Sequence, residues 1–447
     1  MRNTLLITLI FLSSIAIRAQ ENPQGRTFNF NLQECLQYAY ENQDSIKNAK
    51  LDIESAKYKV KETFGIGLPQ VSGSAQFQDY LKIPTTLIPA EFFGGDPGTF
   101  APVQFGVKYQ SNAGLSATQL LFNGSYLVGL KASKTYKELS ERNLTRTKIA
   151  TTVAVTKAYY QVLVSGEQIR LLDANLAQLG QQLKETTELN KQGFVERIDL
   201  DRLTVNYNNL QTRRENTVRL VELSTQLLKF QIGMPITDKL EVKDKINNIS
   251  LNLDESQAVD TAAYRNRIEF NLLQTQRKLN ELNVERLKSE YLPSLAAFGT
   301  TSYSFQSDKF RDLYDRKFPT TFVGLQLNVP VFAGFQRKYQ IKQAQIEVKK
   351  SENVLNLVKN GFLLQQESSL ITFRNSIKSL NNQKANMDLA REVLRVSKIK
   401  YQEGVGSSIE VTQAQTELET AENNYIQSLF DALVSKVDLD NAYGRIQ

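Results

Sequence analysis

Histidine and tryptophan are absent from the 447-residue sequence, and cysteine occurs once, at Cys35. Without histidine the chain cannot build a Ser-His-Asp or Cys-His nucleophile system or an imidazole metal site. A single cysteine allows neither an intrachain disulfide nor a CxxC metal or redox site. No Walker lysine or nucleophile elbow is present in the sequence either. We therefore expect neither an enzyme nor a bound cofactor.

The N-terminal residues have the pattern of an export signal. Arg2 supplies a positive charge, Leu5–Ile17 form a mostly apolar run, and Ala19 is a small residue suited to cleavage. We expect residues 1–19 to be a signal peptide. Its removal deletes two arginines and lowers the net charge from +7 to +5, which is too mild to indicate nucleic acid as a partner.

Prolines are few and unevenly spread, and residues 103–234 and 331–447 contain none. Because proline breaks helix interiors, these tracts predict long helices. No segment after residue 19 has the ~18 consecutive apolar residues of a membrane-spanning helix. If the mature chain enters a bilayer, it must therefore use β-strands.

Short motifs recur in the same order along the chain, which predicts an internal duplication. The first copy is expected over residues 20–233 and the second over 257–447, with residues 234–256 as a linker. Matched residues are 224 positions apart up to Pro69 and Pro293, but only 210 apart at Phe122 and Phe332. The first copy therefore has 14 extra residues between Pro69 and Phe122. The matched pairs are Ala39-Tyr40 with Ala263-Tyr264, Leu68-Pro69 with Leu292-Pro293, Phe122 with Phe332, Gly193 with Gly404, Ile198 with Ile409, and Gly233 with Gly444.

Within each copy, alternation of apolar and polar residues predicts one β-hairpin. The strands are expected at about 70–82 and 105–122 in the first copy, and at about 294–305 and 320–332 in the second. The first hairpin is expected to enclose a loop rich in proline, glycine and aromatic residues over 83–104. The second is expected to enclose a charged loop.

Each hairpin is followed by two long predicted helices. They are expected over 125–192 and 199–231 in the first copy, and over 335–402 and 410–443 in the second. A helix of 68 residues would reach ~100 Å, far longer than an ordinary domain helix. A further helix is predicted before each hairpin, at about 31–62 and 257–289. The chain is thus expected to be mainly α, with one hairpin in each of two repeats.

Four amphipathic strands cannot close a barrel alone, because even small barrels use about eight. Association of several chains would close one. The alternative is that both hairpins pack on a water-soluble core, which would make the protein an exported coiled-coil scaffold or adaptor without a pore. The signal peptide, the strand lengths and the very long helices favour an outer-membrane barrel.

Several short segments carry a resemblance to a known family. They are Leu32–Leu36, Ala39–Asn42, the two Leu-Pro pairs, Lys400–Gly404, Ile409–Val411 and Ala414-Gln415. On these segments the sequence resembles the TolC-type outer-membrane efflux family over nearly all of the mature chain. The resemblance implies a homotrimer whose strands form a 12-stranded outer-membrane β-barrel, facing lipid and continuous with an α-helical barrel across the periplasm. It also implies a passive exit duct of an efflux pump or type I secretion system, which binds a periplasmic adaptor protein and is powered by an inner-membrane transporter.

The resemblance also implies a gate at the periplasmic end. By position, the family's acidic residues fall on Asp199 and Glu410, and its gate tyrosine falls on Tyr401. The family's second acidic ring falls on Gln413, and a gate arginine of its best-known member falls on Gly406. These two departures put the closing network and its cation affinity in question.

Each gate candidate has a simpler structural explanation. Ser407 and Glu410 form an S-x-x-E capping box, and Asp199 suits a first helical turn as an anion. Tyr401 could be an ordinary packing residue. Three glycines mark the tip turns that would contact the adaptor, although Gly193 and Gly404 need only be helix C-caps. They are Gly193, Gly404 and Gly406.

Overall fold

The computed structural model describes residues 26–246 and 262–446. The expected signal peptide and parts of the expected linker and second repeat lie outside these residues. The chain forms two compact units, each built from separate segments of sequence. Within the described residues, one comprises 26–51, 142–246, 262–271 and 356–446, and the other comprises Asp52–Glu141 and Leu272–Leu355. We call them the helical unit and the sheet unit and describe each by itself.

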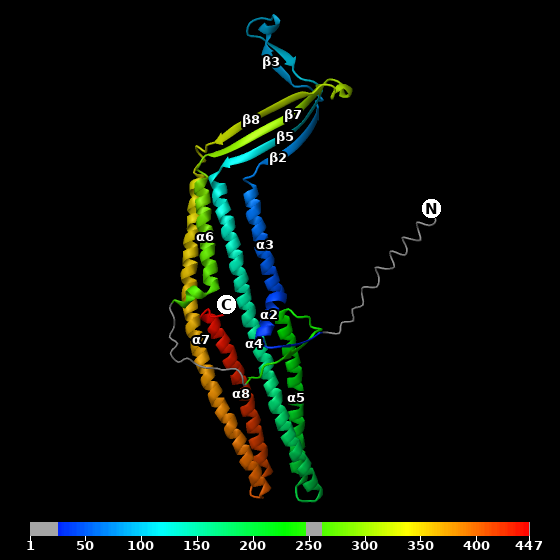
Figure 1. The fold of residues 1–447 in the computed structure, drawn as a ribbon, viewed down its shortest axis with the longest axis vertical. Coiled ribbons are helices and arrows are strands. Elements are labelled where there is room, and N and C mark those ends of the chain that lie inside the picture. The colour runs from blue at the N-terminus through cyan, green and yellow to red at the C-terminus, as the bar shows by residue number, and fades with distance from the viewer. Residues whose placement is uncertain (1–25, 247–261, 447) are drawn as a thin grey trace, which may run out of the picture. The chain divides into compact units, whose positions relative to one another are not determined.

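The sheet unit contains one four-stranded antiparallel sheet in the order β2-β5-β7-β8 (Figure 1). The strands are β2 (Gln70–Asp79), β5 (Tyr109–Phe122), β7 (Ser294–Ser307) and β8 (Phe318–Asn328). Val71 lies opposite Ala117, Ala117 opposite Gly299, and Gly299 opposite Val323. Strands from the two halves of the sequence therefore meet at the β5–β7 pair.

The register separates apolar from polar side chains across all four strands. Residues opposite each other in the sheet point to the same side, so each face can be followed from strand to strand. The apolar face carries Val71, Ala75, Phe77, Ala113, Leu115, Ala117, Leu295, Ala297, Val323, Leu325 and Leu327. The polar face carries Ser72, Ser74, Gln76, Asn112, Ser116, Thr300, Ser302, Ser304, Thr320 and Gln326.

Two features complete these faces. Phe298 and Phe322 lie on the face that carries most of the polar side chains, and they form an edge-to-face aromatic pair with ring centroids 6.1 Å apart. On the apolar face, Phe77 and Tyr109 stack near the loop end of the sheet, and Phe310 packs edge-on against both. Aromatic side chains thus gather at that end of the apolar face.

The strand boundaries correct the sequence prediction in three places. The strand expected to start at residue 105 starts at Tyr109, because Gly106 has φ +132 and interrupts the extended chain. The strand expected to end at residue 332 ends at Asn328, two residues before Pro330, which lacks the N–H that continues a ladder. The strand expected to end at residue 82 ends at Asp79.

The loop expected over 83–104 contains a hairpin of its own. β3 (Thr85–Pro89) pairs with β4 (Phe100–Gln104), and the short 3-10 helix η1 (Ala90–Phe93) lies between them. Pro102 lies within β4 opposite Leu87, in a two-stranded ladder where an edge position tolerates proline. The proline content that predicts a loop is therefore compatible with strands here.

Four long helices have nearly the predicted bounds. They are α4 (Gly124–Lys191), α5 (Arg197–Ile232), α7 (Gln336–Gln402) and α8 (Ser408–Ala442). Helices α4 and α7 contribute residues to both units. Among the described residues, no helix combines the length and apolar character needed to cross a membrane.

The helix expected over about 31–62 is divided into α2 (Leu32–Asn42) and α3 (Asp44–Gly65). The break is at Gln43, whose extended backbone lets its side-chain oxygen accept a hydrogen bond from the Ser45 N–H. At the start of α2, Asn31 and Glu34 form a complete capping box. The helix before the second hairpin is α6 (Ile268–Ser289).

The helical unit has an unpredicted parallel pair, β1 (Thr27–Phe30) with β6 (Lys239–Val242). It packs beside an apolar cluster that joins α2, α4 and α5. Cys35 is fully buried there, and this burial raises the pKa of its thiol to about 12. The core of this unit therefore includes residues from the expected linker.

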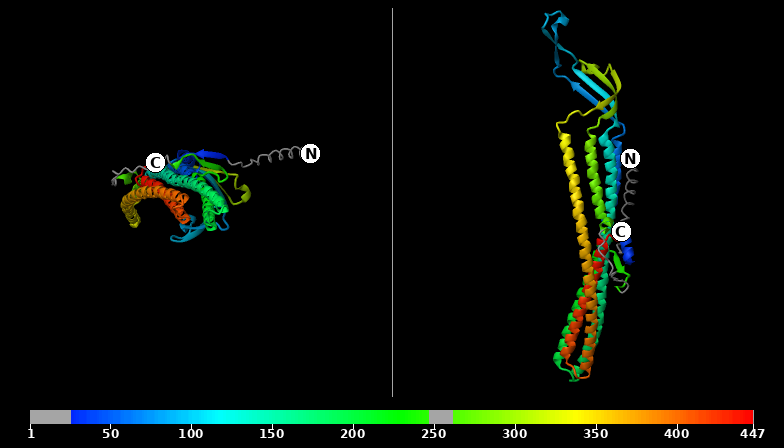
Figure 2. Two further views of the ribbon diagram at one scale, coloured as in Figure 1. Left: turned by 90° about the horizontal axis from the view of Figure 1, so that it is seen from below. Right: turned by 90° about the vertical axis from the view of Figure 1, so that its left-hand side faces the viewer.

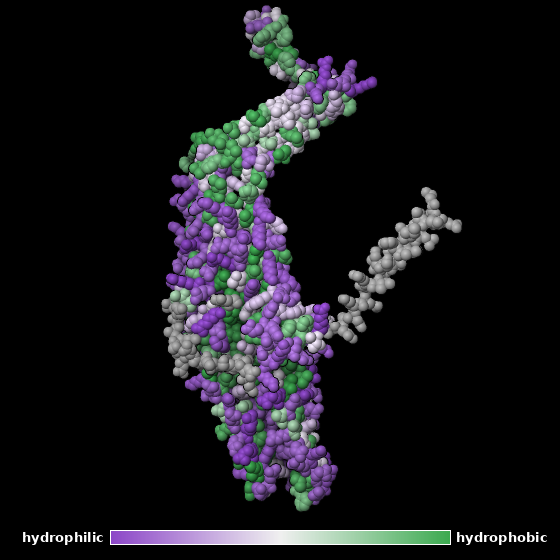
Figure 3. All heavy atoms as spheres, in the orientation of Figure 1, coloured by the Kyte–Doolittle hydropathy of each residue, from purple (hydrophilic) through white to green (hydrophobic). Residues whose placement is uncertain are grey.

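The strands and the helices of the sheet unit differ in the hydropathy of their surfaces. In Figure 3, hydrophobic side chains gather where the strands meet the helices of that unit, whereas hydrophilic side chains dominate the helix surface next to them. Large apolar residues on β8 are open to the surroundings, with Val323 85% and Leu325 68% exposed. The described part of one chain thus leaves much of the apolar face of its sheet exposed.

Candidate functional site at the two helical turns

The two turns that connect the long helices have the same backbone structure and lie at the same end of the helical unit (Figure 2). In the first, Phe194 N–H donates to Leu189 O and Gly193 N–H donates to Asn190 O. In the second, Val405 N–H donates to Lys400 O and Gly404 N–H donates to Tyr401 O. Both are Schellman motifs, which require a left-handed residue at the glycine. Gly193 and Gly404 have φ +82 and +73.

Gly406 has a different reason to be glycine. Its φ is not positive, but a Cβ at this position would lie 3.0 Å from both the Lys400 Cβ and the Tyr401 N. Its own N–H donates to Lys400 O at 3.0 Å. The chain therefore passes too close to the end of α7 to accept a side chain easily.

Asp199 lies in the first turn of α5 and connects the two turns. It accepts a hydrogen bond from Ser408 Oγ at the start of α8, and Arg202 Nη1 lies 3.5 Å from its Oδ1. The sequence prediction includes Asp199 but misses both partners. Arg202, three residues further along the same helix, could have been found from helical spacing. Ser408 is 209 residues away and has no comparable local signal.

Glu410 and Gln413 lie on the first turns of α8, and both are exposed. Ser407 is the N-cap of α8, and its Oγ accepts a hydrogen bond from the Glu410 backbone N–H at 3.2 Å. This bond uses the Glu410 backbone, so the carboxylate is available to face solvent. Gln413 donates from Nε2 to Glu417 Oε1 at 3.1 Å on the same helix.

Tyr401 lies near Asp199 and packs partly against an apolar cluster shared by α7 and α8. Burial raises the pKa of Tyr401, and the negative charge of Asp199 adds to this rise. Tyr401 also lines a groove of ≈ 530 Å³ at the turns. The other lining residues include Gln178, Gln182, Leu189, Phe194, Lys398 and Gly406. The structure thus places Asp199 and Tyr401 together, with Glu410 and Gln413 on the adjoining helix.

The family profile "Outer membrane efflux protein" matches residues 35–214 and 262–445, which is most of the chain. The chain belongs to this family. It is 19% identical to the outer membrane protein TolC of Vibrio cholerae, over 75% of this chain and 77% of that protein. It is 22% identical to a probable efflux pump outer membrane protein, TtgC of Pseudomonas putida, over 92% of this chain and 82% of that one.

Solved structures of outer-membrane channels share the fold. The open state of the Neisseria gonorrhoeae MtrE outer membrane channel matches with a TM-score of 0.73 and 16% identity, and covers 93% of this chain and 89% of that one. The CusC structure matches with a TM-score of 0.72 and 14% identity, and covers 96% and 95%. At these identities the likeness establishes the fold, which is mainly helical with strands.

Alanine substitution at Gly404 in the second turn, compared with Gly361 within α7, tests the assigned turn structure. Gly404→Ala should lower the free energy of unfolding by ~1–2 kcal/mol, because alanine disfavours a left-handed backbone. Gly361, exposed in the middle of α7, has nothing within 4 Å of an added Cβ, so Gly361→Ala should raise stability by ~1 kcal/mol. Thermal unfolding followed by helical circular dichroism would compare the two variants. Equal effects of the same sign would contradict the assigned turn.

Proposed function

We propose that this chain is the outer-membrane exit duct of an efflux pump or type I secretion system. Three chains form a 12-stranded β-barrel joined to an α-helical barrel in the periplasm, and the duct binds a periplasmic adaptor and an inner-membrane transporter. Its transport is passive. Family membership and the fold shared with outer-membrane channels support this function.

The observation that carries the proposal is the separation of faces in the sheet. Most apolar side chains of β2, β5, β7 and β8 share one face, and most of the polar side chains, together with the Phe298–Phe322 pair, share the other. Outer-membrane barrels need this pattern, with apolar residues toward lipid and polar residues toward the lumen. The stacked Phe77 and Tyr109 near the loop end suit the interfacial aromatic girdle.

The edges of the sheet support closure by other copies of the chain. In the described residues, β2 and β8 each pair with one strand only. A row of unpaired N–H and C=O groups is very costly in lipid. Since neighbouring strands alternate in direction across four strands, β8 of one chain is antiparallel to β2 of the next. The barrel can therefore close with whole chains.

The alternative is an exported soluble scaffold, which would have to cover the apolar face of the sheet with other apolar surface. The exposure of Val323 and Leu325 disfavours it. Within the barrel interpretation, we propose that Asp199, Tyr401, Glu410 and Gln413 line the gate. The turns at Gly193, Gly404 and Gly406 contact the adaptor. The two-repeat organisation over residues 20–233 and 257–447 remains part of this proposal.

A pair of neighbouring substitutions tests the facing of the strands. Leu325→Arg should sharply reduce outer-membrane trimer, because an arginine facing lipid near the midplane costs ~2–4 kcal/mol and three chains carry it. Gln326→Arg should leave assembly intact and shift the channel toward anions. Membrane fractionation and bilayer conductance would measure both effects. Equal tolerance at both positions would mean that this face of β8 meets water.

The gate assignment predicts three changes in conductance. Asp199→Ala with Tyr401→Phe, and separately Ser408→Ala, should raise passive conductance in a planar bilayer without changing trimer yield, because each removes support from the contact between the turns. Glu410→Gln should weaken block by multivalent cations, because it removes one carboxylate from every chain. Glu403→Gln, at an exposed position in the same turn, is the matched control. If all these variants behave as wild type, capping and packing fully explain these residues.

A further inference from the structure

Near the turns, the long helices form two pairs that are each held together by apolar side chains. Leu172 and Leu179 of α4 cluster with Leu203 and Leu210 of α5. The residues of α7 and α8 form a separate cluster. Its members are Met387, Leu394, Val411, Ala414 and Leu418. Each pair therefore has its own apolar core and packs as a coiled coil.

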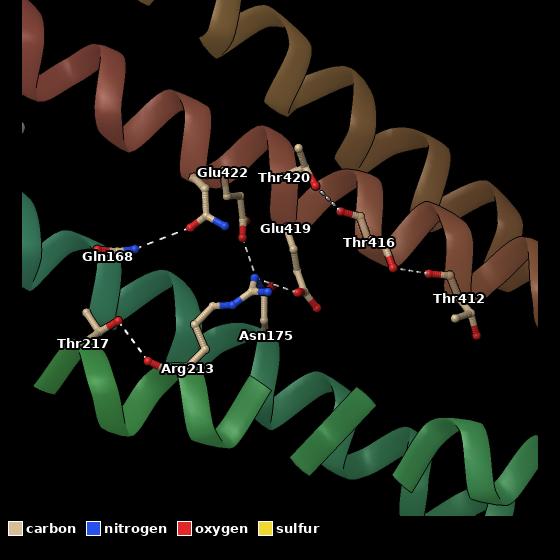
Figure 4. Close-up of polar contacts among 10 residues, drawn as sticks. Gln168, Asn175, Arg213, Thr217, Thr412, Thr416, Glu419, Thr420 and Glu422 are labelled. Carbon is tan, nitrogen blue, oxygen red and sulfur yellow. Dashed lines mark hydrogen bonds and ion pairs between the residues drawn. The ribbon is translucent and has the colours of Figure 1, made fainter. Parts of the chain in front are cut away.

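Near the turns, the contacts between the two pairs are hydrogen bonds and an ion pair between polar side chains. Asn175 Nδ2 of α4 donates to Glu422 Oε2 of α8 at 2.6 Å, and Arg213 Nη1 of α5 lies 3.0 Å from Glu419 Oε2 (Figure 4). Gln168 Nε2 donates to Asn423 Oδ1 at 3.4 Å. Closer to the turns, Ser408 donates to Asp199. We call the stretch of α8 from Ser408 to Asn423 that makes these contacts the polar seam.

Within one helical turn beyond the polar seam, the contacts between α8 and α4 become apolar. Ile426, Leu429 and Leu433 of α8 pack against Val164 of α4. Ser408, Gln415, Glu422 and Leu429 are spaced seven residues apart, so they fall on one stripe of the helix. Gln415 is buried, and its Nε2 has no partner among the described residues. The same stripe is thus polar near the turns and apolar beyond Glu422.

We propose that the Asn175–Glu422 and Arg213–Glu419 contacts form a second latch that holds the two helix pairs together, in addition to the Asp199–Ser408 contact. The cluster around Val164 is the pivot about which the pairs separate. Polar groups regain hydrogen bonds from water when they separate, whereas apolar groups lose their burial. The inference rests on the proposed channel function, since it assigns a role in opening.

The surroundings of Glu422 suit a contact that can break. Its carboxylate is almost fully buried, and this burial raises the pKa of Glu422, although Asn175 and Arg391 oppose the rise. Arg391 Nη2 of α7 lies 3.6 Å from Glu422 Oε1. Since α7 belongs to the same pair as α8, Arg391 stays beside Glu422 when Asn175 leaves. The carboxylate therefore keeps a counter-ion in both states.

Two variants with opposite expected effects test the latch. Asn175→Ala removes one hydrogen bond and should raise the open probability in a planar bilayer about fivefold. Asn175→Leu with Glu422→Leu extends the apolar stripe toward the turns and should lower the open probability. Arg391 keeps Asp388 as a partner in that double variant, at 3.3 Å. The matched control is Glu392→Gln, which breaks an exposed pair with Arg395 on α7 and should change nothing.

Distance measurements separate this proposal from the channel function itself. Spin labels at Lys184→Cys on α4 and Thr416→Cys on α8, both exposed positions, report the spacing of the pairs by pulsed electron resonance. Cys35 is fully buried with a raised thiol pKa, so it stays unlabelled. Asn175→Ala should broaden the distance distribution, and the double leucine variant should narrow it.

The outcomes are distinct. If the wild type does not conduct under any condition, the channel function fails, while the distances still decide whether the contacts hold the pairs. If both variants give wild-type distances and conductance, or change them in the same direction, the polar seam is ordinary packing and the latch is overturned.

Discussion

The unpaired outer edges of β2 and β8 are the constraint on which the rest of the architecture depends. Within residues 26–246 and 262–446, the four-stranded sheet leaves two rows of backbone N–H and C=O groups without a strand partner, and its apolar face is largely exposed. In lipid, such groups must be paired within the protein. In the proposed channel, association with further copies of the chain would satisfy both requirements at once, because it would close the sheet and turn the apolar face toward lipid.

The helical unit has a corresponding division between permanent and separable contacts. Apolar clusters hold α4 to α5 and α7 to α8, whereas the described contacts of the α8 polar seam with α4 and α5 are polar. The two turns repeat the same Schellman hydrogen bonds, and Asp199 and Ser408 connect them. The proposed latch relies on this division, because the helix pairs would change their spacing without either pair unfolding.

Much of this architecture follows from patterns that are local in sequence. Period-two alternation locates β2, β5, β7 and β8, and proline-free tracts locate the long helices to within about two residues. Gly193 and Gly404 can also be identified from the sequence, because each helix-ending turn depends on a single glycine.

Features that depend on distant residues were not predictable in the same way. The β1–β6 pair joins segments more than 200 residues apart through strands of four residues, too short to show a period. The β3–β4 hairpin contains prolines, which favour a loop over a strand in the sequence prediction. The Ser408 contact to Asp199 depends on how two helices approach each other, although the seven-residue spacing of Ser408, Gln415 and Glu422 does indicate a polar stripe.

The number of chains in the membrane complex tests the central claim most directly. Native mass spectrometry of the mature protein, extracted from outer membranes in detergent, would measure it. The account predicts a single species of three chains, with 12 strands available for the barrel. A monodisperse monomer recovered from the periplasmic fraction without detergent would contradict it, because one chain leaves the edges of β2 and β8 unpaired.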